Sequence, residues 1–436
     1  MKKFTVLIGI VSVILLATLP MLLGLLVDDA NTAARLREIT GQPGLTLNTR
    51  SGWFSSIGTA QIESPIIAGV AYEQVLVDAD LEIIHGPLLW TEQGFRFGLA
   101  WVDITPVLQG LEENDLLQTL FQPDSGAQIS LMAGFDGALH AQLRSGPLRY
   151  AQRQRTFEFD DLVANMDIAR NGAATVGLTS SSVNISEPLY ALTIDALDVE
   201  LQSASLDASP LPGSLAINAE SAQFNGVQRL TLGGISIDYV AREQASAENG
   251  PPSLLLEQRI QVATLESELP VSAFGMQTQL EGVDLQLVAE YLRLQRDLQM
   301  GDPDSSAEQL EEVYIEMLRE PFTQHSLITA TAWGGEHQAD LEIIWPGEPT
   351  LLTMDQLTLG RVVGLLYAEL ELRANEAALL DSMFAASVRN YTAQGVLPQD
   401  NGDVVITAIL QGGNMILNEQ LIQLAPFLNI GNAGTP

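Results

Sequence analysis

Apolar and polar residues alternate one by one along much of the chain between residue 45 and about Gly282. Leu215-Ala216-Ile217-Asn218-Ala219 and Ile260-Gln261-Val262-Ala263 are typical, and this period of two favours strands with one buried face. Turn dipeptides such as Asn171-Gly172, Asn225-Gly226 and Asn249-Gly250 separate these segments. Many consecutive strands joined by short turns predict antiparallel meanders.

A different periodicity predicts one helix inside this β-rich region. Thr105-Pro106 offers an N-cap and a proline in the first turn. The apolar residues that follow, Leu108, Leu111, Leu117, Leu120 and Phe121, predict one helical face up to Pro123. We therefore expect a helix over Thr105 to Phe121.

Helical spacing returns in the second half of the chain. It predicts a helical region over Val283 to Phe322, broken at Gly301-Asp302-Pro303, and a helix over Val362 to Asn390 in which Glu369 pairs with Arg373. A last short helix is expected over Glu419 to Phe427. Strands are predicted between these helices, over Ser326 to Trp333, His337 to Trp345, Val404 to Leu410 and Asn414 to Leu417.

An uncharged apolar run from Phe4 to Val27 follows Lys2 and Lys3. Its helix would be roughly 36 Å long, enough to cross a hydrocarbon core of roughly 30 Å with some tilt. A cleaved signal peptide is the alternative, although no convincing small-x-small cleavage site lies near Val27. The two lysines favour a cytoplasmic N-terminus, while Arg35 and Arg37 weaken this contrast.

The resulting fold class is α+β and mainly β: a single N-terminal transmembrane helix, then an elongated, mostly antiparallel β-meander with several amphipathic helices. The expected order is a cytoplasmic N-terminus (1–3), a transmembrane anchor (4–27), a membrane-proximal helix and turn (28–44), a β-rich periplasmic region with one inserted helix (45–282), a helical region (283–325) and a mixed C-terminal region (326–436).

Charge and composition narrow the classes of function. Fifty-four acidic against twenty basic residues give a net charge of −34, which repels phosphate backbones and argues against nucleic-acid binding. The chain has no cysteine, and this excludes disulfides, thiolate metal sites and a cysteine nucleophile.

No catalytic or cofactor motif stands out. The four histidines lie at 85, 140, 325 and 337, without metal-ligand spacing, and neither a phosphate loop nor a serine-hydrolase elbow is present. His85 ends a predicted strand, so a structural hydrogen bond is favoured over catalysis. We expect no catalytic, cofactor-binding or metal-binding residue, and no cofactor.

Three short stretches carry a specific pattern: Arg50 to Ser56, Ile84 to Leu88 and Gln411 to Asn418. Taken together they resemble the YdgA-like family of bacterial proteins, and the matching positions are Gly52, Trp53, Phe54, Ser55, Ser56, His85, Gly86, Pro87 and Asn418. The last stretch departs from the pattern, since Glu419 follows Asn418 where glycine is expected. Trp53 and Phe54 could either anchor the packing of the meander or form an apolar contact surface. The resemblance implies an N-terminal membrane anchor and a long periplasmic body, and it carries over no catalytic residue.

The preferred hypothesis is a non-enzymatic protein of the bacterial inner membrane. It would be single-pass, anchored through residues 4–27, with most of its chain in the periplasm and an apolar or lipid ligand in a β-sheet groove. One-sidedly apolar strands attached to a membrane also describe the AsmA-like lipid-handling proteins, as an analogy of fold only. The alternatives are a structural protein that associates with itself or with an envelope partner and, less favoured, a carboxylate-based hydrolase of envelope glycans or lipids.

Overall fold

The computed structural model describes residues 45–52, 54–63, 66–67, 70–71, 76–91, 94–109, 127–152, 154–204, 213–244, 252–268, 270–299 and 307–424. They divide into two compact units. The first contains the described parts of Met1–Pro188 and Ala196–Asp207, and the second those of Leu189–Asp195 and Ala208–Pro436. The predicted boundaries near residues 282 and 325 both fall inside the second unit.

The first unit is built on antiparallel strands. Neighbouring strands run in the order β1, β2, β5, β8, β9, β10, β13, β14, while β3–β4 and β6–β7 form separate hairpins. The strands are β1 (Leu45–Ser51), β2 (Ser55–Glu63), β3 (Ile66–Ile67), β4 (Val70–Ala71), β5 (Leu76–His85), β6 (Leu88–Thr91), β7 (Gly94–Phe97), β8 (Ala100–Gln109), β9 (Gln128–Ala133), β10 (Leu139–Ser145), β11 (Leu148–Gln152), β12 (Arg155–Phe159), β13 (Leu162–Ile168) and β14 (Ala174–Glu187).

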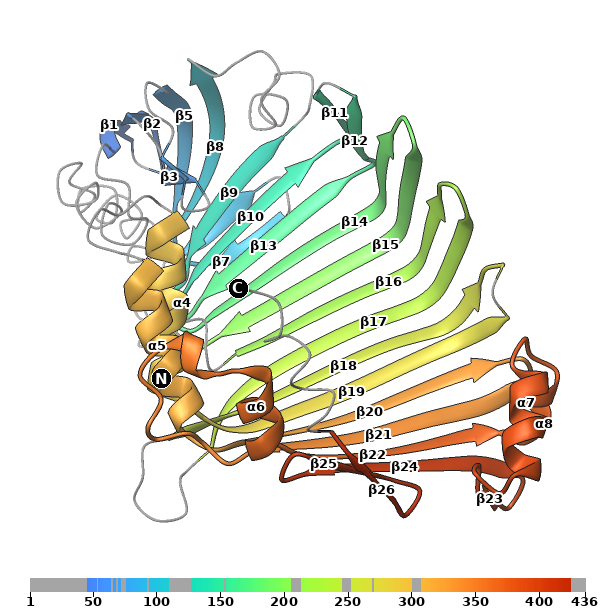
Figure 1. The fold of residues 1–436 in the computed structure, drawn as a ribbon. Helices are drawn as coiled ribbons and strands as arrows, with labels where there is room; N and C mark the ends of the chain where they lie inside the picture. Colours follow the sequence, from blue (N-terminus) through green and yellow to red (C-terminus); the bar gives the residue numbers. More distant parts are fainter. Residues whose placement is uncertain are drawn as a thin grey trace, which may run out of the picture. The chain divides into compact units, whose positions relative to one another are not determined.

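The second unit is also antiparallel and has longer strands (Figure 1). Its strands pair in chain order from β16 to β22, and then through β24, β25 and β26. They are β16 (Gly213–Asn225), β17 (Arg229–Gln244), β18 (Ser253–Glu266), β19 (Val271–Asp284), β20 (Phe322–Ala332), β21 (Gly335–Trp345), β22 (Tyr367–Asn375), β23 (Gln399–Asp400), β24 (Asp403–Gln411), β25 (Asn414–Leu417) and β26 (Gln420–Gln423); β15 (Tyr190–Ser203) contributes to both units. The predicted antiparallel, mainly β fold is confirmed.

The described helices of the second unit connect strand ends (Figure 1). Helices α4 (Leu285–Gln299) and α5 (Ala307–Arg319) leave the end of β19 and return to β20, its direct neighbour. The Asp284 carboxylate caps α4 by accepting from two backbone amides, and the Trp345 indole donates to the carbonyl of Leu318 at the end of α5. The break predicted within this helical region falls at residues 300–306, which are not described.

The opposite ends of the strands are connected in the same manner. Helices α7 (Glu376–Leu380) and α8 (Ala385–Ala393) lie between β22 and β24, which pair with each other. A short 3-10 helix, η2 (Met354–Gln356), and α6 (Leu359–Leu365) precede β22 and lie at the same strand ends as α4 and α5. In Figure 1 the described helices lie at the ends of the strands and not across the middle of the sheet.

The helix predicted over Thr105 to Phe121 is wrong at its start, because residues 105–109 belong to β8. Ala100, Val102, Ile104 and Pro106 continue the alternation of a strand. The pairing of β8 with β9 ends at Ile104, so Pro106, which has no amide proton, faces β5 alone among the described strands. Residues 110–121 of this prediction lie outside the described part of the chain.

The single helix predicted over Val362 to Asn390 is wrong at its centre, which β22 occupies, while α6, α7 and α8 form parts of its two ends. The spacing of Leu366, Leu370 and Ala374 fits a helix, but Ala368, Leu370, Leu372 and Ala374 equally fit a strand of period two. Pairing with strands on both sides selects the strand. Arg373 consequently forms ion pairs with Glu371 and Asp400 and not with the predicted Glu369.

At the C-terminal end, Gln420–Gln423 forms β26 where the start of a helix was expected. Hydrogen bonding to β25 overrides the local helical preference there. The predicted anchor (4–27) and the membrane-proximal helix lie outside the described residues. Among the helices that are described, none combines the length and the apolar composition that a membrane crossing requires.

Candidate functional site

One row of apolar side chains crosses eight strands of the second unit. Residues directly opposite each other in an antiparallel pair project to the same face of the sheet, so the strand registers define this row. We call it the apolar row: Ile217, Ile237, Ile260, Met276, Ile328, Ala339, Leu372 and Ile406. Branched aliphatic residues, Met276 and Ala339 follow one another without a polar residue between them, so this row is continuously apolar.

The next row along the strands faces the other side of the sheet and is mostly polar. It consists of Asn218, Ser236, Gln261, Gly275, Thr329, Gln338, Arg373 and Val405, and we call it the polar row. These two neighbouring rows of the second unit therefore differ sharply in chemistry. This is the arrangement of a sheet that places one face against apolar matter and the other in water.

The apolar row is not enclosed by the described part of the protein. Each of its eight side chains remains partly exposed, and Ile328 is 37 % exposed. The hydrophobic core cluster that the described residues form lies elsewhere, in the first unit, around Ala79, Leu81 and Ile83. A sheet in water normally buries such a face under a second layer. The exposed apolar row is therefore the candidate binding site for an apolar ligand.

The first unit has an equivalent apolar face that begins at the residues singled out in the sequence. Its register places Ser56 opposite Ile83, and the row continues through Val102, Leu131, Ala141, Met166 and Val176. At this end the face is tightly packed, because Leu47, Ala60 and Ile104 lie against the buried cluster. Ser56 is thus the polar start of an apolar row.

Ser56 and His85 meet on this face. The hydroxyl of Ser56 lies 2.7 Å from Nε2 of His85, and both residues are only 2 % exposed. The backbone amide of His85 donates to the carbonyl of Phe54, so the two sequence stretches are joined by backbone and side chain. Burial lowers the pKa of the His85 imidazole below its ordinary value, because the charged form would lose its hydration. A neutral, hydrogen-bonded histidine results.

The neighbouring motif residues shape the turn after β5. Gly86 donates to the carbonyl of Leu99, and a Cβ atom at Gly86 would lie only 1.7 Å from the carbonyl oxygen of Gly98. The Gly86–Pro87 peptide is cis. Phe54 and Ser55 are exposed, and Trp53 lies outside the described residues. The structure therefore brings Ser56, His85 and Gly86 together in one junction.

Asn418 lies in the second unit, away from this junction in the strand order. Its side chain accepts from the amide of Thr407 and donates to the carbonyl of Val396. Asn418 and Glu419 form the turn between β25 and β26, with φ angles of 45° and 66°. Both angles are in the left-handed region, which explains why glycine is the expected residue after Asn418.

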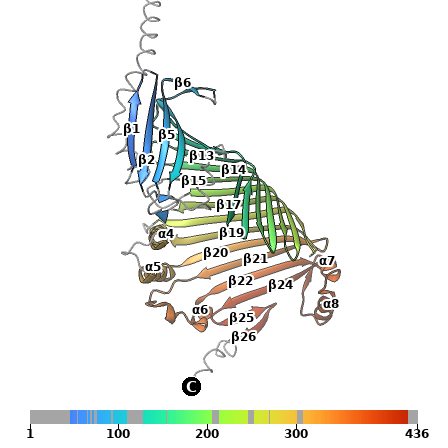
Figure 2. The same cartoon turned by 90° about the horizontal axis from the view of Figure 1, so that it is seen from above.

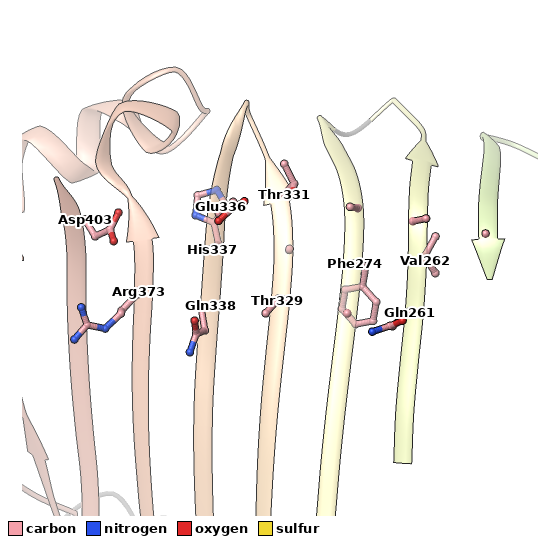
Figure 3. A pocket seen from close by; sticks show the side chains of 15 residues that line it. Gln261, Val262, Phe274, Thr329, Thr331, Glu336, His337, Gln338, Arg373 and Asp403 are labelled. Carbon is pink, nitrogen blue, oxygen red and sulfur yellow. The ribbon is translucent and has the colours of Figure 1, made fainter. Parts of the chain in front are cut away.

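A trough of about 560 Å3 lies in the second unit (Figure 3). Five of its lining residues belong to the polar row: Gln261, Gly275, Thr329, Gln338 and Arg373. Gly275 and Thr329, which have short side chains, pair with each other in its lining. Its arginine is paired with Glu371 and Asp400, and the His337 ring donates to the carbonyl of Ala332. These groups stabilise strand ends and form no nucleophile–base pair.

Within the described residues, no group of three or more His, Asp or Glu side chains is placed to hold a metal ion. Ion pairs such as Arg149–Glu158 and Arg242–Glu257 join neighbouring strands at the surface. Their geometry matches structural cross-strand pairs.

The sequence matches one known protein family. A family model described as bacterial protein of unknown function (DUF945) matches residues 1–329. The chain belongs to the DUF945 family. This membership covers the first unit and the second unit as far as β20, and the resemblance to YdgA-like proteins is consistent with it. No curated protein and no solved structure matches the chain.

Sequence reasoning missed the apolar row as a site. The alternation within each strand was evident, but the registers that align Ile260 with Met276, and Met276 with Ile328, are set by pairing. The signal in the sequence was the large number of one-sidedly apolar strands combined with too few predicted helices to cover them.

Proposed function

We propose that this DUF945 protein is a non-enzymatic, membrane-anchored envelope protein that holds the acyl chains of lipids along the apolar face of its sheet. The observation that carries the proposal is the apolar row across eight strands, uncovered among the described residues and partly exposed at every position.

The dimensions of the row suit a lipid chain. Neighbouring strands lie about 4.8 Å apart, so seven spacings extend over about 34 Å. The hydrocarbon core of a bilayer is about 30 Å thick, and one leaflet about half of this. An acyl chain lying across the strands would therefore remain in contact with apolar side chains along its whole length.

The energetics favour the same class of ligand. Each methylene group transferred from water to an apolar surface contributes about 0.8 kcal/mol, and branched aliphatic side chains offer that surface without polar competitors. The acidic character of the chain, −34 in total, lies in the rest of the protein and on the polar face, where Asp238, Glu257 and Glu371 are placed. The row itself contains no charge.

The proposed location is the bacterial inner membrane, with the body in the periplasm. The uncharged run from Phe4 to Val27 supports a single anchor, and Lys2 and Lys3 support a cytoplasmic N-terminus. Membership of a bacterial family is compatible with this location. An anchored protein with an apolar sheet face would receive its ligand from the adjacent leaflet.

The test is lipid analysis of the full chain, extracted from bacterial membranes in mild detergent and compared with two neighbouring variants. Ile328→Asp places a charge in the apolar row, and Thr329→Asp places the same charge on the opposite face. We expect native mass spectrometry to find lipid bound to the wild type and to Thr329→Asp, and at least a threefold lower lipid content in Ile328→Asp.

Equal lipid content in all three proteins, or none in the wild type, would overturn the proposal. The alternative of an interaction protein predicts a different occupant for the same face. A single cysteine at Ile328 would then crosslink to a second protein in intact membranes, and no lipid would be recovered.

A further inference from the structure

The β6–β7 hairpin has an apolar face that points away from the protein. The pairing places Leu88 opposite Phe97 and Trp90 opposite Phe95, and all four side chains are exposed. Trp90 is 80 % and Phe97 67 % exposed. We call these four residues the hairpin patch. Figure 2 shows β6 standing out beside the end of β2 and β5.

The hairpin that carries the patch is well packed on its other face. On the inner face of the hairpin, Leu89 is fully buried and Thr91 is 5 % exposed. The Arg96 guanidinium lies 5.7 Å from the centre of the Trp101 ring, and Gly98 donates to the carbonyl of Pro87 at the base of the hairpin. The backbone is therefore fixed, and the outer face is held in water by the fold.

The aromatic rings of the patch are arranged as one surface. Phe95 packs edge-on against both Trp90 and Phe97, with ring centroids 6.2 Å and 5.2 Å apart. Three aromatic rings and a leucine exposed together would be costly in a freely soluble position. Tryptophan in particular is enriched where an apolar phase meets water, because its ring is amphipathic.

Charge and chain length favour a lipid bilayer as the partner of the hairpin patch. Residues 88–97 contain Glu92 and Arg96 and are neutral, and residues 45–62 contain Arg50 and no carboxylate, in a chain of net charge −34. An acidic lipid surface would repel the neutral hairpin less than the acidic strand before it, β5, which carries Asp78, Asp80 and Glu82. Only 17 residues separate Val27 from Leu45, a reach of roughly 60 Å when fully extended.

We propose that the hairpin patch inserts into the interface of the membrane in which the chain is anchored. This inference rests on the anchoring stated under Proposed function. Insertion would hold the Ser56–His85 end of the first unit at the bilayer surface, since β6 follows the Gly86–Pro87 turn directly. The apolar face of the first unit would then start at the bilayer surface, where it could receive lipids from the leaflet.

Site-specific labelling of the full chain tests this inference, because the protein has no native cysteine. Trp90→Cys and Phe97→Cys label the patch. Phe135→Cys is the matched control: Phe135 is 54 % exposed, belongs to the same unit and lies between β9 and β10. Each variant carries an environment-sensitive NBD fluorophore and is reconstituted in vesicles of phosphatidylethanolamine and phosphatidylglycerol that contain shallow doxyl-labelled lipid.

We expect blue-shifted emission and at least threefold stronger quenching by doxyl lipid at both patch positions than at Phe135. The protein could float with the vesicles while iodide in the water quenches the patch labels as strongly as the control label. That result would overturn the inference and leave the anchor intact. Labels shielded from both quenchers would indicate a protein contact and also overturn it. Failure to float would overturn the anchoring and, with it, the inference.

Discussion

The Ser56 hydroxyl and Nε2 of His85 are 2.7 Å apart, with both residues almost fully buried at the start of an apolar strand row. This hydrogen bond joins two stretches that lie 29 positions apart in the chain. It places the one buried imidazole of the described residues next to the turn that leads into the β6–β7 hairpin. A polar pair in this position fixes the register of β2 on β5.

Ser56→Ala should weaken this junction without changing the fold. The substitution leaves a buried imidazole nitrogen without its hydroxyl partner, which costs about 1 to 3 kcal/mol. Hydrogen exchange at the amides of β2 and β5 measures the local opening free energy. Ser55→Ala, at the exposed neighbouring position, should change it by no more than about 0.5 kcal/mol. Equal effects of the two variants would contradict the role assigned to the pair.

The stability of the same region should depend on pH in one direction. Burial lowers the pKa of His85 below 6.5, so the unfolded chain takes up a proton at a higher pH than the native chain does. The resulting stability is complete above pH 6.5 and is lost as the pH falls from 6.5 through the lowered pKa.

His85→Gln should remove this pH dependence from the hydrogen exchange of β2 and β5. His140→Gln, in which an exposed histidine on β10 is replaced, should retain it. An unchanged pH profile in His85→Gln would show that another group titrates in this region.

Gly86→Ala should be among the most damaging small substitutions in the first unit. The added methyl group would meet the Gly98 carbonyl at 1.7 Å, so the backbone must move, and overpacking of this kind costs about 1 to 3 kcal/mol or more. Gly177→Ala, where no heavy atom lies within 4 Å of the new Cβ, is the control and should fold normally. Thermal unfolding of the two full-length variants compares them, and a normal transition in Gly86→Ala would argue against the tight approach.

Glu419→Gly should stabilise the C-terminal hairpin. Glu419 has a φ of 66°, and a non-glycine residue there costs about 1 to 2 kcal/mol. Asn418→Gly is the matched comparison, because it also relieves strain but loses the side-chain bonds to Thr407 and Val396. We expect slower hydrogen exchange in β24 and β25 for Glu419→Gly and faster exchange for Asn418→Gly. Slower exchange in both would mean that the asparagine side chain contributes little.

The alternation of apolar and polar residues within each strand was predictable from the sequence. The alignment of the strands into one apolar row was not. Ile260, Met276 and Ile328 each appear in a period-two segment, yet only pairing places them in one row. The errors have the same origin. Leu370 and Ala374 satisfy helical and strand periodicities at once, and hydrogen bonds from β21 and β24 decide between them.

The motif residues were found by resemblance, and their geometry was beyond reach of the sequence. A structural hydrogen bond for His85 was favoured, but its partner, Ser56, is adjacent only because β2 pairs with β5. The glycine expected after Asn418 had a local physical reason, the left-handed turn. The hairpin patch was unforeseen, since Trp90 and Phe95 look like core residues until their exposure is known.

The most direct test of lipid binding along the apolar row is photocrosslinking in living cells. A diazirine-bearing amino acid is incorporated at Ile328 or at Thr329 of the full-length chain, and adducts formed on illumination are identified by mass spectrometry. The two positions are adjacent in β20 and face opposite sides of the sheet. Phospholipid adducts at Ile328 and few at Thr329 are predicted. Equal adducts at both positions, or only protein adducts at Ile328, would contradict the account.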